Sequence, residues 1–190
     1  MDTGQIVAIV VLVIILVVVI AALLAWQRKR KTDELKGQFG PEYERTVQDR
    51  GDRRAAEQEL ADRQEHRSTL QIRELDAVRR QQFSDSWQHI QSRFVDEPDG
   101  AVSDAHRLVR EVMGERGYPT DDFEQQADDV SVDHPDVVGD YREAVRINDA
   151  SRQGRATTEE LREAMVHYRS LFARLLGEQG SQGTQEARGR

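Results

Sequence analysis

The sequence predicts an all-α protein with an N-terminal transmembrane helix, a charged stalk helix and a small cytoplasmic helical bundle. Three observations support this fold class. One uninterrupted apolar segment lies near the N-terminus, apolar residues elsewhere recur at spacings of three and four, and no segment alternates between apolar and polar residues over a useful length. The first two patterns are typical of helices. A half-buried strand would require the alternation of apolar and polar residues that is missing here.

The apolar segment, Ile6 to Trp26, contains no charged residue, proline or glycine. At the rise of an α-helix it would reach roughly 31 Å, the hydrocarbon thickness of a bilayer. Directly behind it lie the basic residues Arg28, Lys29, Arg30 and Lys31. Basic flanks stay on the cytoplasmic side of the cell membrane, so we expect residues 1–5 outside, Trp26 at the headgroups and the rest of the chain in the cytoplasm.

A cleaved signal peptide is the alternative interpretation, and it would make the rest of the chain a secreted domain. Secretory signals begin with basic residues, but residues 1–5 contain none, and the basic cluster resembles a stop-transfer signal. We therefore expect an uncleaved single-pass anchor, although Ala21, Ala22 and Ala25 imitate a cleavage site. Ala21 and Ala25 also form a weak small-xxx-small pattern for homo-oligomerisation.

Residues 27–48 form a basic juxtamembrane segment. Leu35, Phe39 and Tyr43 recur there every four positions, and Gly40-Pro41 should prevent one continuous helix from the membrane. The three large side chains would lie either on the headgroup surface or against the following domain.

Residues 49–75 are predicted to form the charged stalk helix. Apolar content is thin there, with Ala55, Ala56 and Leu60 as a narrow stripe. Because a coiled coil needs sustained heptads, we expect either an exposed stalk or a helix that docks along one side.

The helical domain should occupy residues 76–177. Its first helix is predicted over 76–95, where Phe83, Trp87 and Ile90 follow helical spacing, and residues 96–100 break it. Asp99 or Ser103 would cap the next helix. That helix should stop at Gly117, since Pro119 follows shortly after.

Three further helices complete the predicted domain. A short one runs from Phe123 to about Asp129, and another from about Pro135 to Arg152, with Asp133 as its N-cap. The last helix is the most clearly marked, because Thr157-Thr158-Glu159-Glu160 matches a capping box and Gly177 provides a stop. Residues 178–190 are rich in Gly, Gln, Ser and Arg and are predicted to be disordered.

Composition argues against several functional classes. The formal net charge of −8 disfavours nucleic-acid binding, which needs a basic face. Cysteine is absent, which excludes disulfides and thiolate metal sites. The five histidines are scattered, and phosphate-loop and hydrolase motifs are missing. We therefore expect no metal site, no cofactor and no catalytic residue.

The candidate partner or ligand surface consists of Asp133, His134, Tyr141, His167 and Arg169. Asp133 beside His134 would tune the protonation of the imidazole. The same residues support two hypotheses. In the first, the domain binds a cytoplasmic protein through residues 123–152 and the stalk. In the second, Asp133 and His134, together with His167 or Arg169, converge on a pocket of a ligand sensor or an enzyme.

Five short sequence segments carry a family resemblance: Phe39-Gly40-Pro41-Glu42-Tyr43, Trp87 with Arg93-Phe94-Val95-Asp96, Arg116-Gly117-Tyr118-Pro119, Val132-Asp133-His134-Pro135 and Met165-Val166-His167-Tyr168-Arg169. In these segments the chain resembles an actinobacterial family of single-pass membrane proteins whose function is uncharacterised. The resemblance implies a membrane anchor and no catalytic residues. The expectation from sequence is therefore a non-enzymatic scaffold, adaptor or regulator at the inner membrane face.

Overall fold

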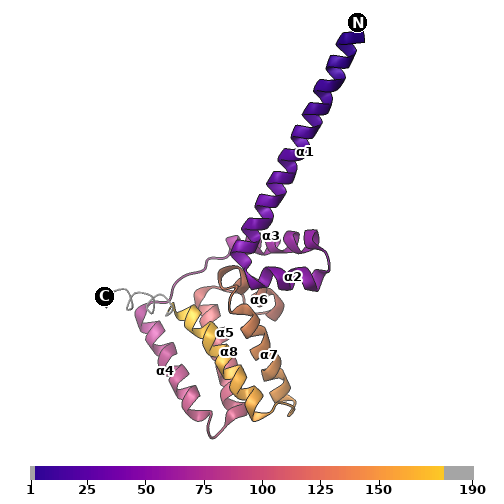
Figure 1. The fold of residues 1–190 in the computed structure, drawn as a ribbon. Helices are drawn as coiled ribbons and strands as arrows, with labels where there is room; N and C mark the ends of the chain where they lie inside the picture. The colour runs from indigo at the N-terminus through magenta and orange to yellow at the C-terminus, as the bar shows by residue number, and fades with distance from the viewer. Residues whose placement is uncertain (1–2, 178–190) are drawn as a thin grey trace, which may run out of the picture. The chain divides into compact units, whose positions relative to one another are not determined.

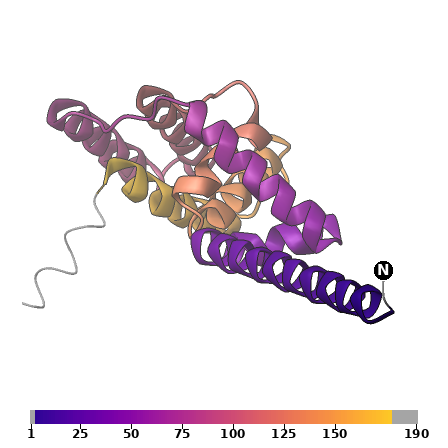
Figure 2. The same ribbon diagram turned by 90° about the horizontal axis from the view of Figure 1, so that it is seen from above.

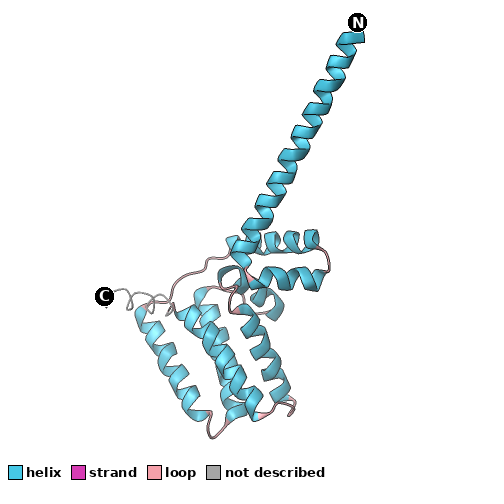
Figure 3. Ribbon diagram, viewed as in Figure 1, coloured by secondary structure: helices cyan, strands magenta, loops and turns pink. Residues whose placement is uncertain are grey.

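The chain is all-helical throughout the residues that its computed structural model describes, which are residues 3–177, without the side chains of 3–11, 13, 24 and 28. Eight α-helices and no strand occur in this range (Figure 3). The predicted fold class is therefore confirmed at the level of an all-α protein. The chain divides into two units, residues 1–38 and residues 39–190.

The described part of the first unit is formed by helix α1, Thr3–Phe39, whose last residue already belongs to the second unit. This helix includes residues 27–39 of the basic juxtamembrane segment and ends before Gly40. Large apolar side chains between Leu12 and Trp26 are 47% to 66% exposed. Among the described residues, no helix combines the length and the apolar character needed to cross a membrane. The expected span includes side chains outside the described set, among them that of Ile6, and the side chain of Arg28 also lies outside it.

The second unit begins with a helical hairpin, α2 (Pro41–Arg50) and α3 (Arg53–Thr69). Gly40, with φ 47°, separates α1 from α2, and Pro41 occupies the first turn of α2, as Gly40-Pro41 predicted. Phe39 and Tyr43 are almost fully buried within this unit, so they pack on the domain rather than lying free.

Helix α3 differs from the predicted stalk. It is shorter than residues 49–75, because Gly51 ends α2 in a left-handed conformation and the Asp52 side chain caps the next helix. Ala56 and Leu60 have no exposed surface, and α3 packs against α2 and α6. The structure thus favours the docking alternative over a free stalk.

Helices α4 (Ala77–Arg93) and α5 (Pro98–Arg116) lie close to their predicted positions. The start of α5 differs in its cap: Pro98 begins the helix after Glu97, and neither Asp99 nor Ser103 caps it. Gly117 ends α5 with φ 98°. A Cβ atom there would lie 2.6 Å from the backbone oxygen of Gln71, so only glycine fits this close approach.

The expectation that Asp133 would cap the helix after α6 is wrong. Helix α6 extends over Phe123–Asp133, and α7 begins only at Val138. The hydrogen-bond ladder of α6 continues until the His134 amide donates to the Val130 carbonyl at 2.8 Å. Residues 134–137 then form the turn into α7, Val138–Arg152, so Pro135 lies in this turn rather than near the first position of a helix.

Helix α8, Thr158–Leu176, has the predicted capping box between Thr157 and Glu160 and ends at Gly177. It packs against α5 and α7, while α4 packs against α5 (Figures 1 and 2). Tyr141 and Tyr168 lie at the centre of this core, and the Trp87 ring stacks on that of Phe172 with centroids 4.9 Å apart. The predicted tail, residues 178–190, lies outside the described residues.

Candidate functional site

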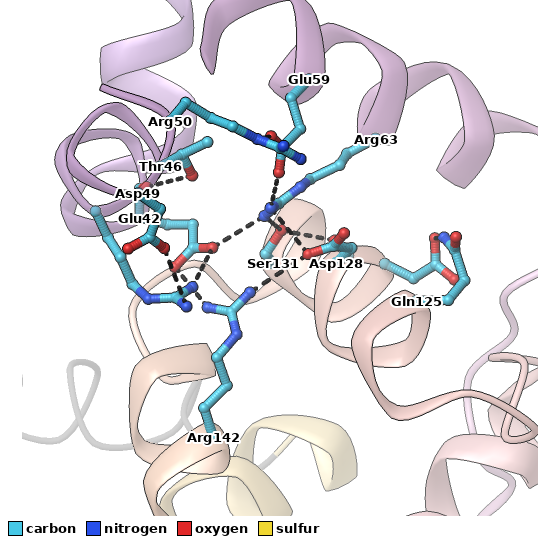
Figure 4. A network of polar contacts seen from close by, with 12 residues as sticks. Glu42, Thr46, Asp49, Arg50, Glu59, Arg63, Gln125, Asp128, Ser131 and Arg142 are labelled. Carbon is cyan, nitrogen blue, oxygen red and sulfur yellow. Dashed lines mark hydrogen bonds and ion pairs between the residues drawn. The ribbon is translucent and has the colours of Figure 1, made fainter. Parts of the chain in front are cut away.

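The most concentrated polar site in the domain is an ion-pair network that joins four helices (Figure 4). Glu42 of α2 lies at its centre and is 2% exposed. Its Oε1 accepts a hydrogen bond from Arg63 Nη1 of α3 at 2.9 Å, and its Oε2 accepts one from Arg142 Nη1 of α7 at 2.8 Å. Asp128 of α6 completes the network, 2.9 Å from Arg63 Nη2 and 3.4 Å from Arg142 Nη2.

Local sequence explains why Glu42 and Arg63 point inward. Glu42 lies in the first turn of α2, where a carboxylate is favoured by the helix dipole, and the buried Tyr43 follows it directly. Arg63 lies three and seven positions after Leu60 and Ala56, on the same buried face of α3. The aliphatic part of the Arg63 side chain therefore lies between α3 and α6, while its guanidinium reaches the carboxylates of Glu42 and Asp128.

The rim of the network adds further partners. Glu59 is paired with both Arg63 and Arg50. Arg45 approaches Glu42 Oε1 at 3.2 Å from the exposed side of α2. Ser131 accepts a hydrogen bond from Arg63 at 3.3 Å and donates one to the Asp128 carbonyl at 2.6 Å.

Electrostatics keep the centre of the network ionised. Burial by itself raises the pKa of Glu42, but the hydrogen bonds and charges of Arg142 and Arg63 outweigh it, so the net pKa lies below its usual value. For Asp128 the balance is reversed, because burial raises its pKa by more than Arg63 and Arg142 lower it. Since the guanidinium groups already engage both oxygens of Glu42, this site is suited to holding helices together rather than to acid–base chemistry.

Asp133 and His134, the most suggestive pair in the sequence, lie at the end of α6. Asp133 Oδ2 accepts hydrogen bonds from Arg67 Nε and from the Tyr118 hydroxyl, both at 2.5 Å. His134 is half-buried, and its Nε2 has no partner among the described residues. Burial, followed by the charge of Arg116, lowers the pKa of His134.

The other three predicted surface residues lie elsewhere. Tyr141 has no exposed surface and donates its hydroxyl to Gln126 Oε1 at 2.8 Å, so it is a core residue. His167 lies 3.3 Å from Asp140, and Arg169 is exposed on α8. Three cavities among the described residues are lined by other side chains, and none of the five predicted residues takes part in them.

Metal ligation was not expected, and the described residues contain no group of three or more His, Asp or Glu placed to hold a metal ion. The ion-pair network itself did not emerge from the sequence. One local signal could have indicated part of it: Arg63 continues the spacing of Ala56 and Leu60, which places a charged residue on an otherwise apolar stripe.

No protein-family model matches the chain, and no curated protein or solved structure matches it either. The family resemblance of the sequence therefore stays a prediction.

Proposed function

We propose that this chain is a single-pass membrane protein whose helical domain, from Phe39 onward, acts by binding a partner protein at the cytoplasmic face. The observation that carries the proposal is the exposure of consecutive apolar side chains in α1. Residues 14–20 are all large and aliphatic, and each is between 47% and 60% exposed. Because these seven apolar residues are consecutive, they indicate whether α1 is in contact with lipid or with a protein groove.

Seven consecutive residues point in every direction around a helix, because successive side chains are about 100° apart. A docking groove on a soluble partner would cover only one face of such a helix. Lipid surrounds a helix on all sides, and a helix that is apolar all round is typical of a membrane span or a large core. Bilayer insertion is therefore the environment that accounts for the whole run.

The end of the apolar run also suits a membrane interface. Trp26 is 59% exposed, and the Arg30 guanidinium lies 5.5 Å from the centroid of its ring. An indole with a neighbouring cation is typical of the headgroup level, where one end of the pair is apolar and the other is solvated. The basic residues that follow would then face the cytoplasm.

Membrane attachment can be tested by placing charge inside the run. The paired substitutions Leu16→Arg and Val17→Arg should release the full chain from membranes washed with alkaline carbonate, because each arginine at the bilayer centre costs about 2.5–3.5 kcal/mol on insertion scales. The matched control is Val78→Arg with Val95→Arg, two valines that are 66% and 86% exposed in the second unit. If the control is retained and the α1 variant is also retained, insertion through residues 14–20 is refuted.

Orientation can be tested directly because the chain has no cysteine. In intact cells, a membrane-impermeant maleimide should label Thr3→Cys but should reach Gln153→Cys only after lysis. The opposite pattern would refute the cytoplasmic domain. Loss of the N-terminal segment from the mature chain would instead support the secreted alternative.

A binding role is supported by the two-sided character of α3. Its inner face is buried on α2 and α6, while its outer face carries exposed charged residues such as Glu65. A photo-cross-linking residue at position 65 should give a discrete adduct with one cellular protein, and the same residue at the exposed position 162 of α8 should not. Absence of an adduct specific to position 65 would count against α3 as the docking surface.

A further inference from the structure

Two adjoining cavities lie among α5, α6 and α7, within the second unit. The larger, with a volume of about 600 Å³, is formed mainly by α5 and the C-terminal end of α7. The smaller, about 220 Å³, extends to α6. His106 and Arg110 line both cavities, so the two volumes meet at these side chains. Together they fall in the size range of small-molecule sites.

The larger cavity has a cationic wall, although the whole chain has a net charge of −8. Arg107, Arg110 and Arg152 line it, against a single carboxylate, Glu111. The Arg110 guanidinium donates to the backbone carbonyl of Thr120 rather than to an acid. Arg152, like Arg110, forms no ion pair among the described residues, and both side chains are exposed to solvent.

The smaller cavity has a different lining. Asp121 and Asp149 provide carboxylate acceptors, and Phe123 and Val145 provide apolar surface. Carboxylates accept hydrogen bonds from hydroxyl or amino groups, and they repel an anion. A ligand that fills both cavities would therefore carry its negative charge at one end and hydrogen-bond donors at the other.

His106 lies at the junction with a defined hydrogen bond. Its Nδ1 is 3.0 Å from the hydroxyl of Tyr168, which has no exposed surface. Burial raises the pKa of Tyr168, so the phenol keeps its proton, and donating that proton to Nδ1 is what satisfies the buried hydroxyl. The neutral imidazole then carries its own proton on Nε2, so that His106, a lining residue of both cavities, has one hydrogen-bond donor to offer.

We propose that this pocket binds a phosphate monoester of a small polar molecule, about the size of a nucleoside monophosphate. The phosphate lies against Arg110, Arg152 and the His106 Nε2 proton, because guanidinium groups match phosphate oxygens in charge and geometry. Hydroxyl or amino groups of the ligand meet Asp121 and Asp149. None of the residues that line the pocket belongs to α1, so this proposal does not depend on the proposed membrane anchoring.

Calorimetric titration of the full chain in detergent micelles tests the proposal. Adenosine monophosphate and ribose 5-phosphate are the probes, with inorganic phosphate and adenosine as the two separated halves. Arg152→Gln should weaken binding of the phosphate esters by about tenfold, the loss expected for one charge-assisted contact. The matched control is Arg155→Gln, since Arg155 is an exposed arginine nearby in the sequence whose guanidinium hydrogen-bonds to the Gln153 side chain.

Three outcomes would overturn the proposal. The first is the absence of binding of both esters at about 10 mM, the weak end of specific recognition. The second is binding of inorganic phosphate as tight as that of the esters, which would show that Asp121 and Asp149 contribute nothing. The third is equal weakening by Arg152→Gln and Arg155→Gln, which would reduce the effect to general charge.

Nuclear magnetic resonance of labelled histidines supplies a readout at the site. Burial and then Arg110 lower the pKa of His106, with Arg152 adding to this effect and Asp149 opposing it. A bound phosphate should raise that pKa and shift the His106 ring signal, while His66, His89, His134 and His167 serve as internal references. Equal shifts at all five histidines, or none at His106, would contradict the placement of the phosphate.

Discussion

The substitution Glu42→Gln should open the α2–α3 hairpin. It is nearly isosteric, so it removes charge from the centre of the ion-pair network while leaving the shape of the site unchanged. In the native chain Glu42 is 2% exposed, and its two oxygens accept hydrogen bonds from Arg63 at 2.9 Å and Arg142 at 2.8 Å. The variant leaves two largely buried guanidinium groups facing a neutral amide.

The magnitude follows from these two contacts. A hydrogen bond to a charged group contributes about 1.5–3 kcal/mol, and removing one partner of a buried ion pair costs about 3–5 kcal/mol. The amide keeps one acceptor oxygen, and both arginines keep Asp128, so the lower end of the range applies. We therefore expect a loss of about 3 kcal/mol, which is a large part of the stability of a typical domain.

Native-state hydrogen exchange is the appropriate assay, because it reports opening of each helix separately. Amides of α3 between Ala56 and Arg63 should lose protection by about a hundredfold, since every 1.4 kcal/mol is tenfold. Amides of α8 should change less, because the α8 contacts with α5 and α7 are formed by apolar residues such as Leu171 rather than by the network.

The matched control is Glu143→Gln, which removes the same charge from an exposed pair with Arg146 on α7. Exposed ion pairs contribute little, so this control should leave the exchange of α3 unchanged. A change in α3 protection of less than about threefold would refute this reasoning, because two largely buried guanidinium groups that lose their ionised Glu42 partner should cost more than that.

Three further predictions concern separate features of the domain. Gly117→Ala should lower the free energy of unfolding by about 1–3 kcal/mol in thermal denaturation, because residue 117 has a left-handed backbone and an added Cβ would meet the Gln71 backbone oxygen. Gly139→Ala is the matched control: an added Cβ has no neighbour within 4 Å there, so it should stabilise α7 slightly. Thr157→Ala should cost about 1 kcal/mol in urea unfolding, because it removes the cap of α8. The pKa of His106 is lowered in the fold, so the unfolded chain binds this proton more readily and stability should fall as the pH drops below about 6.5; His106→Gln should remove that share of the pH dependence.

The helices were predictable because their signals are local. Apolar spacing, caps and stop residues act within one or two turns, so the Thr157 capping box and the Gly117 stop identified α8 and the end of α5 from the sequence. The boundary between α6 and α7 was not predictable in this way. Asp133 is a good N-cap by residue type, but its carboxylate is held instead by Arg67 and Tyr118, partners that only the tertiary fold brings near.

The ion-pair network could not be inferred from the sequence for the same reason. Glu42 and Arg63 are 21 residues apart, and Glu42 and Arg142 are 100 apart. The chain contains 27 basic and 35 acidic residues, so composition does not indicate which of them meet. Nor could the His106 pocket be inferred, because its cationic wall combines α5 with the end of α7.

The position of the network explains why charged residues are buried there at all. The buried apolar residues of α3 are Ala56 and Leu60. Two such side chains interlock little with the neighbouring helices, so they do little to fix the position of α3 along α2 and α6. Buried ion pairs add little net stability, but they disfavour every arrangement in which a charge loses its partner. Arg63 lies 2.9 Å from both Glu42 and Asp128, and a shift of α3 along α2 or α6 would lengthen at least one of these two contacts. The apolar stripe thus attaches α3 to the domain, and the charges determine where it sits.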